Sequence, residues 1–382
     1  MTKVLVVDDS ALMRRLLTGV LTDAGFQVAS ARNGVEGVQQ LTEWQPDVVT
    51  LDINMPEMDG LTALSLMMQA RPTPVVMVSS LTEKGAQATF EALALGAVDF
   101  IAKPGGTISL TVDDIADQLI QKVKAASRAR MRPASGATIR AAEAPARMAL
   151  GRSAPRPPAA APAPAATAAA SAAPTTDGAA PRASAALAKL DGVVIVGVST
   201  GGPRTLEDIL PLLPADFPWP VLVAQHMPSN FTDTFAKRMD KLCRITVREC
   251  NTTLPLEPGH AYIGKGGTDM VVVERLGRIA VQPRPETPGH PWHPSVDVLV
   301  DSAMKLVPPE RIVGVQLTGM GNDGARAMAQ LKARGGRTIA ESKDTAVVFG
   351  MPQELIALGG ASLVLPCTEV TRQLCHWIHK KT

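Results

Sequence analysis

The sequence predicts an α/β protein with two parallel-sheet domains: an N-terminal (βα)5, flavodoxin-like domain and a larger, doubly wound, mostly parallel C-terminal domain. Three observations predict this architecture. Short apolar strands alternate with helical patterns at both ends of the chain. A segment rich in Ala and Pro separates the two alternating parts. The length of 382 residues is also too great for one ordinary domain.

The N-terminal part repeats a strand–helix unit five times within residues 1–122. Helical spacing predicts helices over residues 11–25 and 35–44, with others before and after the last strand. Five such units imply a parallel sheet with helices on both faces. The predicted strands cover residues 3–7, 27–31, 46–52, 74–80 and 99–104.

The middle of the chain predicts a linker over residues 123–188. Residues 125–188 contain 28 Ala and 9 Pro, and no aromatic residue occurs between 101 and 216. Proline at this density breaks helices, and alanine buries too little area to offset chain entropy. We therefore expect this segment to be disordered and partly extended.

Residues 189–382 resume the alternation and predict the second domain. Residues 270–282 form two apolar runs that predict a hairpin turning at Gly277. The remaining predicted strands cover residues 193–199, 221–227, 244–250, 312–320, 337–342 and 362–366. The predicted helices cover residues 203–213, 296–307 and 324–334.

The charge distribution argues against a nucleic-acid-binding domain. Residues 1–122 contain 8 Lys/Arg and 15 Asp/Glu, whereas residues 123–188 contain 9 and 2. The basic surplus therefore lies in the linker and not on one folded face. No signal-peptide pattern and no run of about 18 apolar residues occurs, which predicts a cytoplasmic protein without membrane insertion. The four cysteines form no C-x-x-C pair and indicate reduced thiols.

Acidic and polar side chains follow four strands of the N-terminal domain. Asp8 and Asp9 follow the first strand, Asp52 the third, Ser79 the fourth and Lys103 the fifth. Because parallel strand ends meet at one edge, we expect these side chains to converge. Three carboxylates repel one another, and Mg²⁺ relieves that repulsion. A phosphoryl group on Asp52 would meet this metal, an ammonium group and a hydroxyl; the alternative is a solvated acidic loop set.

A possible nucleophile occurs where the first strand of the C-terminal domain ends. Residues 197–201 fit G-x-S-x-G, a turn that exposes a serine, here Ser199, between a strand and a helix. Pro203 suits the first helical turn, and the helix N-terminus favours developing negative charge. Two alternatives remain for this turn: a phosphate-binding loop, although G-x-G-x-x-G is absent, and a structural glycine turn.

His226 and Asp323 follow two other predicted strands and can meet Ser199 on the same sheet edge. An imidazole activates a serine hydroxyl, and a carboxylate orients that imidazole. The order Ser, His, Asp differs from the common α/β-hydrolase order Ser, Asp, His. His293 precedes a predicted helix, and it either lines the substrate site or is a surface or packing residue.

The N-terminal motifs VDDS, LDINMPEMDG, VSSLT and DFIAKP resemble the response-regulator receiver domain over residues 1–122. The resemblance implies that Asp52 accepts the phosphoryl group from a chemotaxis histidine kinase. It implies that Asp8, Asp9, Asp52 and the backbone carbonyl of Asn54 hold Mg²⁺. It also implies that the phosphoryl group contacts Ser79 and Lys103, and that Phe100 is a rotamer switch.

The C-terminal motifs GVSTGGP, QHMPSNFTDTFAKRM, PSVD and LTGMGNDGA resemble the catalytic domain of the chemotaxis protein-glutamate methylesterases. The resemblance implies cofactor-free hydrolysis of glutamate methyl esters on chemoreceptors and deamidation of receptor glutamines. Ser199, His226 and Asp323 match the family triad, and the Met320 amide matches its oxyanion hole.

These resemblances suggest that the receiver covers the catalytic edge until phosphorylation of Asp52 shifts Ser79 and Phe100. Two other functions remain as alternatives. A signalling scaffold with a degenerate site conflicts with the complete triad. A DNA-binding response regulator conflicts with the roughly 200 residues of α/β pattern after the linker.

Overall fold

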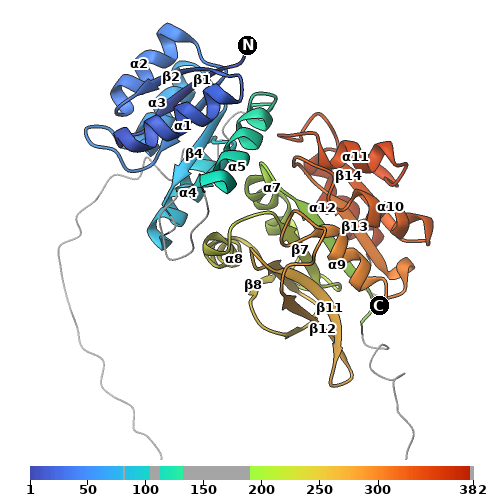
Figure 1. Ribbon diagram of the computed structural model, residues 1–382. Helices are drawn as coiled ribbons and strands as arrows, with labels where there is room; N and C mark the ends of the chain where they lie inside the picture. Colours follow the sequence, from blue (N-terminus) through green and yellow to red (C-terminus); the bar gives the residue numbers. More distant parts are fainter. Residues whose placement is uncertain (81, 104–111, 132–189, 379–382) are drawn as a thin grey trace, which may run out of the picture.

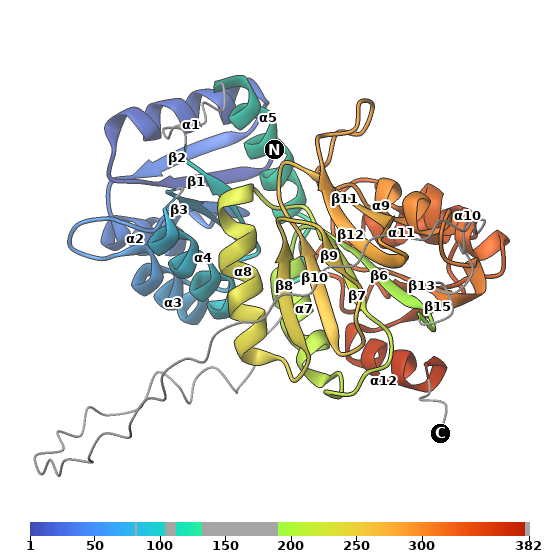
Figure 2. The same cartoon turned by 90° about the horizontal axis from the view of Figure 1, so that it is seen from below.

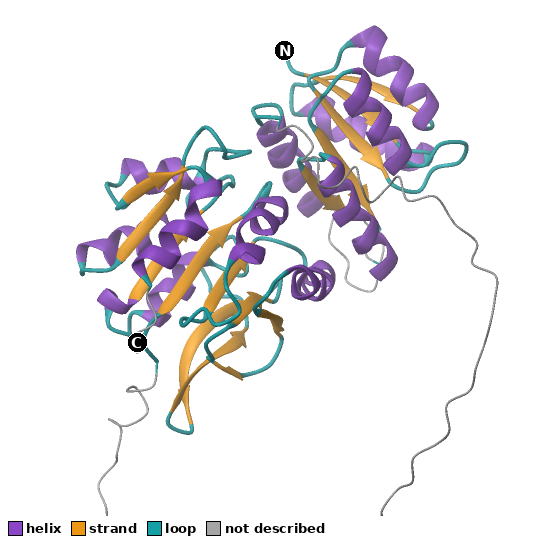
Figure 3. Cartoon of the chain, turned by 180° about the vertical axis from the view of Figure 1, so that it is seen from behind, coloured by secondary structure: helices purple, strands orange, loops and turns teal. Residues whose placement is uncertain are grey.

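The computed structural model describes residues 1–80, 82–103, 112–131 and 190–378, and it contains two sheet-centred units (Figure 1). Apart from residues 123–131, the predicted linker lies outside the described residues. Helices cover both faces of each main sheet, as the α/β prediction requires (Figure 3). Among the described helices, none combines the length and apolarity that a membrane crossing requires.

The N-terminal unit is a parallel five-stranded sheet in the order β2-β1-β3-β4-β5, which confirms the predicted flavodoxin-like fold. Helices α1 and α5 pack on one face, and α2, α3 and α4 form the other layer. The strands are β1 (Lys3–Val7), β2 (Gln27–Ala31), β3 (Val48–Asp52), β4 (Val75–Ser79) and β5 (Asp99–Ala102). The helices are α1 (Ala11–Asp23), α2 (Gly34–Trp44), α3 (Gly60–Ala70), α4 (Glu83–Leu95) and α5 (Val112–Ala126).

Short polar residues start these helices by accepting a hydrogen bond from an amide three residues further along. Ser10, Asn33, Asp59 and Thr82 do so for α1, α2, α3 and α4. The end of α5 is less evident from sequence, and the predicted domain boundary at residue 122 falls inside this helix. Its last turn persists because the side chains of residues 123, 125 and 126 are buried.

The C-terminal unit has a parallel seven-stranded sheet in the order β15-β14-β13-β6-β7-β10-β8. Its strands are β6 (Val193–Val198), β7 (Val221–Gln225), β8 (Thr246–Cys250), β10 (His260–Gly264), β13 (Ile312–Gln316), β14 (Arg337–Glu341) and β15 (Leu363–Leu365). Its helices are α7 (Gly202–Ile209), α8 (Ser229–Leu242), α9 (Val296–Ala303), α10 (Ala325–Ala333), α11 (Met351–Ala357) and α12 (Cys367–Trp377), with 3₁₀ turns η2 (Leu210–Leu212) and η3 (Pro309–Arg311).

A separate antiparallel sheet contains β9 (Leu254–Pro255), β11 (Asp269–Arg275) and β12 (Arg278–Arg284) in the order β11-β12-β9. The predicted hairpin is confirmed, and both turn residues, Leu276 and Gly277, have positive φ. Strand β13 ends four residues earlier than predicted, because the chain then turns to deliver the loop that carries Asp323.

The sheet order of the C-terminal unit places a topological switch point between β6 and β13. From β6 the chain proceeds to β7 on one side, and β13 pairs with β6 on the other. The carboxyl ends of such strands frame the crevice in which open α/β sheets bind ligands. The loops after β6, β7 and β13 are therefore the ones to search for chemistry.

The two units contact each other directly. Helix α4 packs against α7 and α8, and Figure 2 shows α8 beside the N-terminal unit. Phe231 of α8 is fully buried, with its ring centroid 4.4 Å from that of Phe100 and 6.4 Å from that of Phe90. Phe90 also contacts Phe235, at 5.4 Å. An aromatic cluster thus joins β5 and α4 to the C-terminal unit.

Candidate active site and phosphorylation site

Ser199 lies in a sharp turn between β6 and α7. Its amide donates a 2.9 Å hydrogen bond to the Thr318 carbonyl, which holds the turn against the end of β13. Gly201 has φ +77, and a Cβ there would lie 2.7 Å from the Val347 side chain. The turn therefore requires glycine at 201 for both its backbone angle and its space.

Gln225, the last residue of β7, joins the backbones of the two neighbouring site loops. Its side-chain Nε2 donates to the Ser199 carbonyl at 3.0 Å and to the His226 carbonyl at 3.1 Å. Its Oε1 lies so close to Gly202 that a Cβ there would be 2.1 Å away. No motif in the sequence predicts this role for Gln225, although it directly precedes His226.

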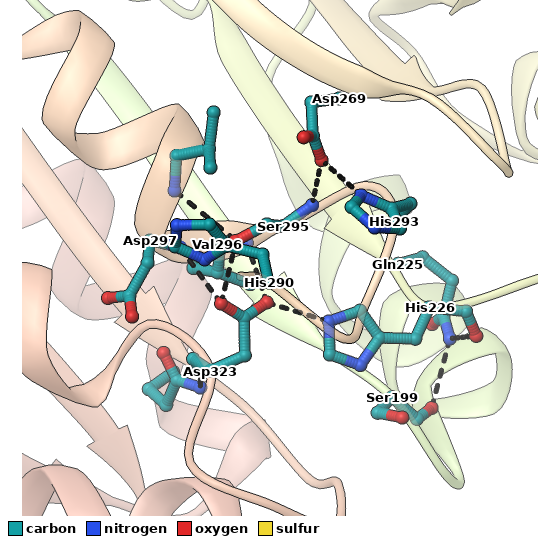
Figure 4. Close-up of polar contacts among 12 residues, drawn as sticks. Ser199, Gln225, His226, Asp269, His290, His293, Ser295, Val296, Asp297 and Asp323 are labelled. Atoms are coloured by element: carbon teal, nitrogen blue, oxygen red, sulfur yellow. Dashed lines mark hydrogen bonds and ion pairs between the residues drawn. The ribbon is translucent and has the colours of Figure 1, made fainter. Parts of the chain in front are cut away.

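His226 lies between Ser199 and Asp323 (Figure 4). Its Nε2 is 2.9 Å from Asp323 Oδ2, and its side chain is 9% exposed. Its Nδ1 is buried and has no hydrogen-bond partner among the described residues. Within the described residues, Ser199 Oγ makes no hydrogen bond to the ring. The structure thus brings the three predicted residues together, with the His–Asp bond formed and the Ser–His bond not formed.

The Asp323 carboxylate is held by the first turn of α9. Oδ1 accepts from Ser295 Oγ at 2.9 Å and from the Asp297 amide at 3.1 Å, and Oδ2 accepts from the Val296 amide at 2.7 Å. Burial alone would raise the pKa of Asp323, but the bonds from His226 and these amides hold it below its usual value. Asp323 is therefore an ionised, fixed acceptor for the imidazole.

Two glycines and the buried side-chain amide of Gln316 shape the loop after β13 that carries Asp323. Gly321 and Gly324 have φ values of +92 and +88, which side chains rarely adopt. Gln316 Nε2 donates to the Asp323 carbonyl at 2.9 Å. The backbone of Asp323 is thus held in place as well as its carboxylate.

His290, Asp297 and Asp323 place possible metal-ligating atoms within 4.8 Å of one another. Their carboxylates already have donors: Asp297 Oδ1 accepts from the Ala327 amide at 2.9 Å, and its Oδ2 lies 3.5 Å from Arg326. Both Asp323 oxygens are also engaged. We therefore assign this cluster to hydrogen-bonded positioning of the triad.

His293 pairs with a buried carboxylate and does not face Ser199 (Figure 4). Its Nδ1 lies 3.0 Å from Asp269 Oδ1, which also accepts from the Ser295 amide at 2.9 Å. Burial would raise the pKa of Asp269, yet hydrogen bonds from Thr287, His293 and Ser295 hold it low. These contacts favour the packing alternative for His293 over the substrate-lining one.

The predicted phosphorylation site converges at the carboxyl edge of the N-terminal sheet. Carboxylate oxygens of Asp8, Asp9 and Asp52 lie within 4.8 Å of one another. Lys103 Nζ lies 2.7 Å from Asp52 Oδ2 and 3.1 Å from Asp8 Oδ2. Burial raises the pKa of Asp52, and the Lys103 ammonium opposes that rise. Three hard oxygen donors at this spacing fit Mg²⁺.

Three other predicted receiver residues lie beside this cluster with different partners. The Asn54 amide donates to Asp52 Oδ1 at 3.4 Å, and the Asn54 side chain is exposed. Ser79 Oγ donates to the Gly85 carbonyl at 3.2 Å and accepts from Thr89 Oγ1 at 2.8 Å. Phe100 is 3% exposed and packs on Phe231. Ser79 thus faces α4. Phe100 faces the interface between the two units, called the seam below, which contains the aromatic cluster and the hydrogen bond from Thr200 to Asp99.

Comparison with known proteins identifies both units. The response regulator receiver domain matches residues 4–112, and the CheB methylesterase family matches residues 194–374. A protein-glutamate methylesterase/protein-glutamine glutaminase 3 from Rhodospirillum rubrum is 53% identical over 381 residues, which cover 100% of this chain and 97% of that protein.

The chain belongs to the CheB methylesterase family.

Two further similarities accompany this match. A protein-glutamate methylesterase/protein-glutamine glutaminase 2 from Rhodopseudomonas palustris is 48% identical, with 99% of this chain and 98% of that protein covered. The crystal structure of the Thermotoga maritima CheB methylesterase catalytic domain is 37% identical, with a TM-score of 0.47, and covers 48% of this chain and 97% of that one.

The sequence motifs predicted the candidate functional residues but not the residues that position them. The motifs contained every triad and receiver candidate. The residues that hold the triad, among them Gln225, Gln316 and Ser295, received no role, because only the fold shows their hydrogen bonds. The motif PSVD was recognised in the sequence, but its hydrogen bonds to the Asp323 carboxylate were not predicted.

Proposed function

We propose that this chain is a phosphorylation-activated protein-glutamate methylesterase of the cytoplasm that also deamidates glutamines, and that chemoreceptors are its substrates. The observation that carries the proposal is the meeting of Ser199, His226 and Asp323 at the sheet's switch point. The names of the full-length relatives support the substrate chemistry. We retain the division into receiver (1–122), linker (123–188) and catalytic domain (189–382), with α5 continuing to Ala126.

In the proposed reaction, Ser199 Oγ attacks the glutamyl ester carbonyl as His226 Nδ1 takes its proton. His226 Nδ1 is suited to this role because it is buried, has no partner in the part of the chain that the structure describes, and is not the nitrogen bonded to Asp323. The resulting imidazolium returns the proton to the departing methoxide, and methanol leaves. Water then attacks the acyl-enzyme by the same route, giving glutamate and free serine. A glutamine substrate releases ammonia in place of methanol.

The Met320 amide is our candidate for stabilising the oxyanion. Gly319 precedes it, and a Cβ on Gly319 would lie 2.7 Å from Ser199 Cβ, so this backbone passes directly over the nucleophile. Among the described residues, the Met320 amide has no hydrogen-bond acceptor. A free backbone donor beside the reacting carbonyl is what an oxyanion hole requires.

In the receiver, we propose that Asp52 accepts a phosphoryl group from a chemotaxis histidine kinase. Asp8, Asp9, Asp52 and the Asn54 carbonyl would hold Mg²⁺, whose charge neutralises the phosphoryl oxygens during transfer. Lys103 already pairs with Asp52 and would move to the phosphoryl oxygens. Ser79 would then exchange its bond to the Gly85 carbonyl for one to the phosphoryl group.

We further propose that the described arrangement is the closed, inhibited state. The seam includes Phe100, the switch aromatic, and Thr200, the neighbour of the nucleophile. Phosphorylation that draws Ser79 and Phe100 toward Asp52 would weaken the seam and admit a receptor helix. The esterase reaction itself needs no cofactor in this scheme.

The first test is methanol release from methylated receptor membranes, with and without a phosphodonor and Mg²⁺. Wild type and Ser302→Ala, a serine outside the site, should release methanol faster with the donor, whereas Ser199→Ala should release none. Release that survives Ser199→Ala would require another nucleophile. If wild type releases none and a serine-reactive fluorophosphonate fails to label Ser199, the scaffold alternative is favoured.

A further inference from the structure

Trp292 lies parallel to the His226 ring. The two ring centroids are 5.8 Å apart, and the planes differ by 4° (Figure 4 shows the His226 ring). Trp292 is half-buried and belongs to the loop that leads into α9. Neither the motifs nor the proposed mechanism gives this indole a role.

The surroundings of Trp292 hold its ring in place. On one side is Gly321, where a Cβ would lie 2.7 Å from Trp292 Cζ2. The residues that follow Trp292 in the chain are also held: His293 pairs with Asp269, and the Ser295 amide donates to the same carboxylate. The indole is thus wedged between the loop that carries Asp323 and the ring of His226. Such a fixed ring limits the orientations available to the imidazole.

We propose that Trp292 is a positioning residue for the general base, and that its π face stabilises the imidazolium formed on His226 during acyl transfer. This inference rests on the proposed esterase function. An indole face attracts a cation within about 6 Å of the ring centroid, and tryptophan does so best among the aromatic residues. Asp323 stabilises the same cation from the ring edge at Nε2, so the two groups act from different directions.

Stacking on neutral imidazole is the competing explanation, in which Trp292 only fills space. The two explanations differ in the protonation state of His226 that Trp292 stabilises. A packing contact acts equally on both protonation states of His226, whereas a cation–π contact acts on the imidazolium alone and therefore accelerates the chemical step. Substitutions that keep the shape of the indole but reduce the negative charge of its face separate the two.

The experiment places mono-, di- and trifluorinated tryptophan at position 292 of the full chain and measures methanol release with phosphodonor and Mg²⁺. The proposal expects kcat to fall stepwise, by about two- to fivefold over the series, with KM and the unfolding temperature unchanged. The same series at Trp219, which packs on the core away from His226, is the matched control and should change nothing. An unchanged kcat across the position-292 series would overturn the proposal.

A second readout does not depend on the substrate. The rate at which a fluorophosphonate labels Ser199 also requires proton transfer to His226, so it should fall in the same order across the series. Trp292→Phe should label faster than Trp292→Leu, because both are apolar but only Phe keeps a π face. If wild type labels but releases no methanol, the proposed substrate is wrong, and the labelling series still decides the role of Trp292. Equal labelling rates would refute that role.

Discussion

Thr200 Oγ1 donates a 2.7 Å hydrogen bond to Asp99 Oδ2, and this bond crosses from the catalytic domain to the receiver. Both residues are buried. Thr200 follows the proposed nucleophile, and Asp99 precedes Phe100, the proposed switch residue. The other Asp99 oxygen pairs with Lys122 at 2.8 Å. The nucleophile turn and the switch strand therefore share one charged hydrogen bond.

Replacing Thr200 by Val should activate the unphosphorylated protein. A buried hydrogen bond to a charged group is worth about 1.5–3 kcal/mol, so losing it should raise basal methanol release by about ten- to 150-fold. The phosphorylated rate should stay unchanged, and the ratio of the two rates should fall accordingly. Thr371→Val is the matched control, because its hydroxyl bonds to the Ile209 carbonyl within the catalytic domain. An unaltered ratio in Thr200→Val would show that this bond does not restrain the enzyme.

Replacing Phe90 by Ala should weaken the seam from the receiver side without touching the catalytic domain. Phe90 is 1% exposed and contacts Phe231 and Phe235. Losing a buried phenyl ring lowers the free energy of unfolding by about 3–5 kcal/mol, and part of this loss comes from the contacts between the two units. We expect higher basal activity and faster amide hydrogen exchange in α8. Phe26→Ala, in the receiver core before the far edge strand, should lower receiver stability but leave α8 exchange unchanged.

Much of the fold was predictable because parallel α/β units carry a strong local signal. The receiver strands have nearly continuous apolar runs, and helices α1 to α4 each begin after a capping residue. The prediction failed to include β9, β10, α8, α11 and α12, however. Strand β10 (HAYIG) mixes polar and apolar residues, and α8 has a fragmented apolar pattern; both form because tertiary packing buries Tyr262 and Phe235.

The site was predictable where chemistry follows a strand end, and not where it depends on contacts between loops. Ser199, His226 and Asp323 follow β6, β7 and β13, so topology alone brings them to one edge. No spacing rule predicts the stack of Trp292 on His226, since the loop that carries Trp292 is distant in sequence. The bond between Thr200 and Asp99 spans the predicted linker and was equally invisible.

Asp52→Asn should abolish stimulation by the phosphodonor while leaving basal methanol release intact. The amide cannot form an acyl phosphate, and it also removes one negative charge beside Lys103. The measurement is methanol release with and without donor, together with intact mass. Asp47→Asn is the control, since Asp47 accepts from the Lys3 amide outside the cluster and should keep both stimulation and the added phosphoryl mass. Persistent stimulation of Asp52→Asn would place the phosphoacceptor elsewhere.

Asp323 should make the stability of the catalytic domain depend on pH in the acid range. Its folded pKa is held below its usual value, so the unfolded chain binds the proton more readily. The stabilisation is therefore complete above the unfolded aspartate pKa of about 3.9 and is lost as pH falls toward the lower folded value. Between pH 5 and 3, wild type should lose about 2–4 °C more in unfolding temperature than Asp323→Asn, which cannot titrate. The exposed Asp191→Asn should follow wild type. Parallel curves for wild type and Asp323→Asn would contradict an ionised, hydrogen-bonded Asp323.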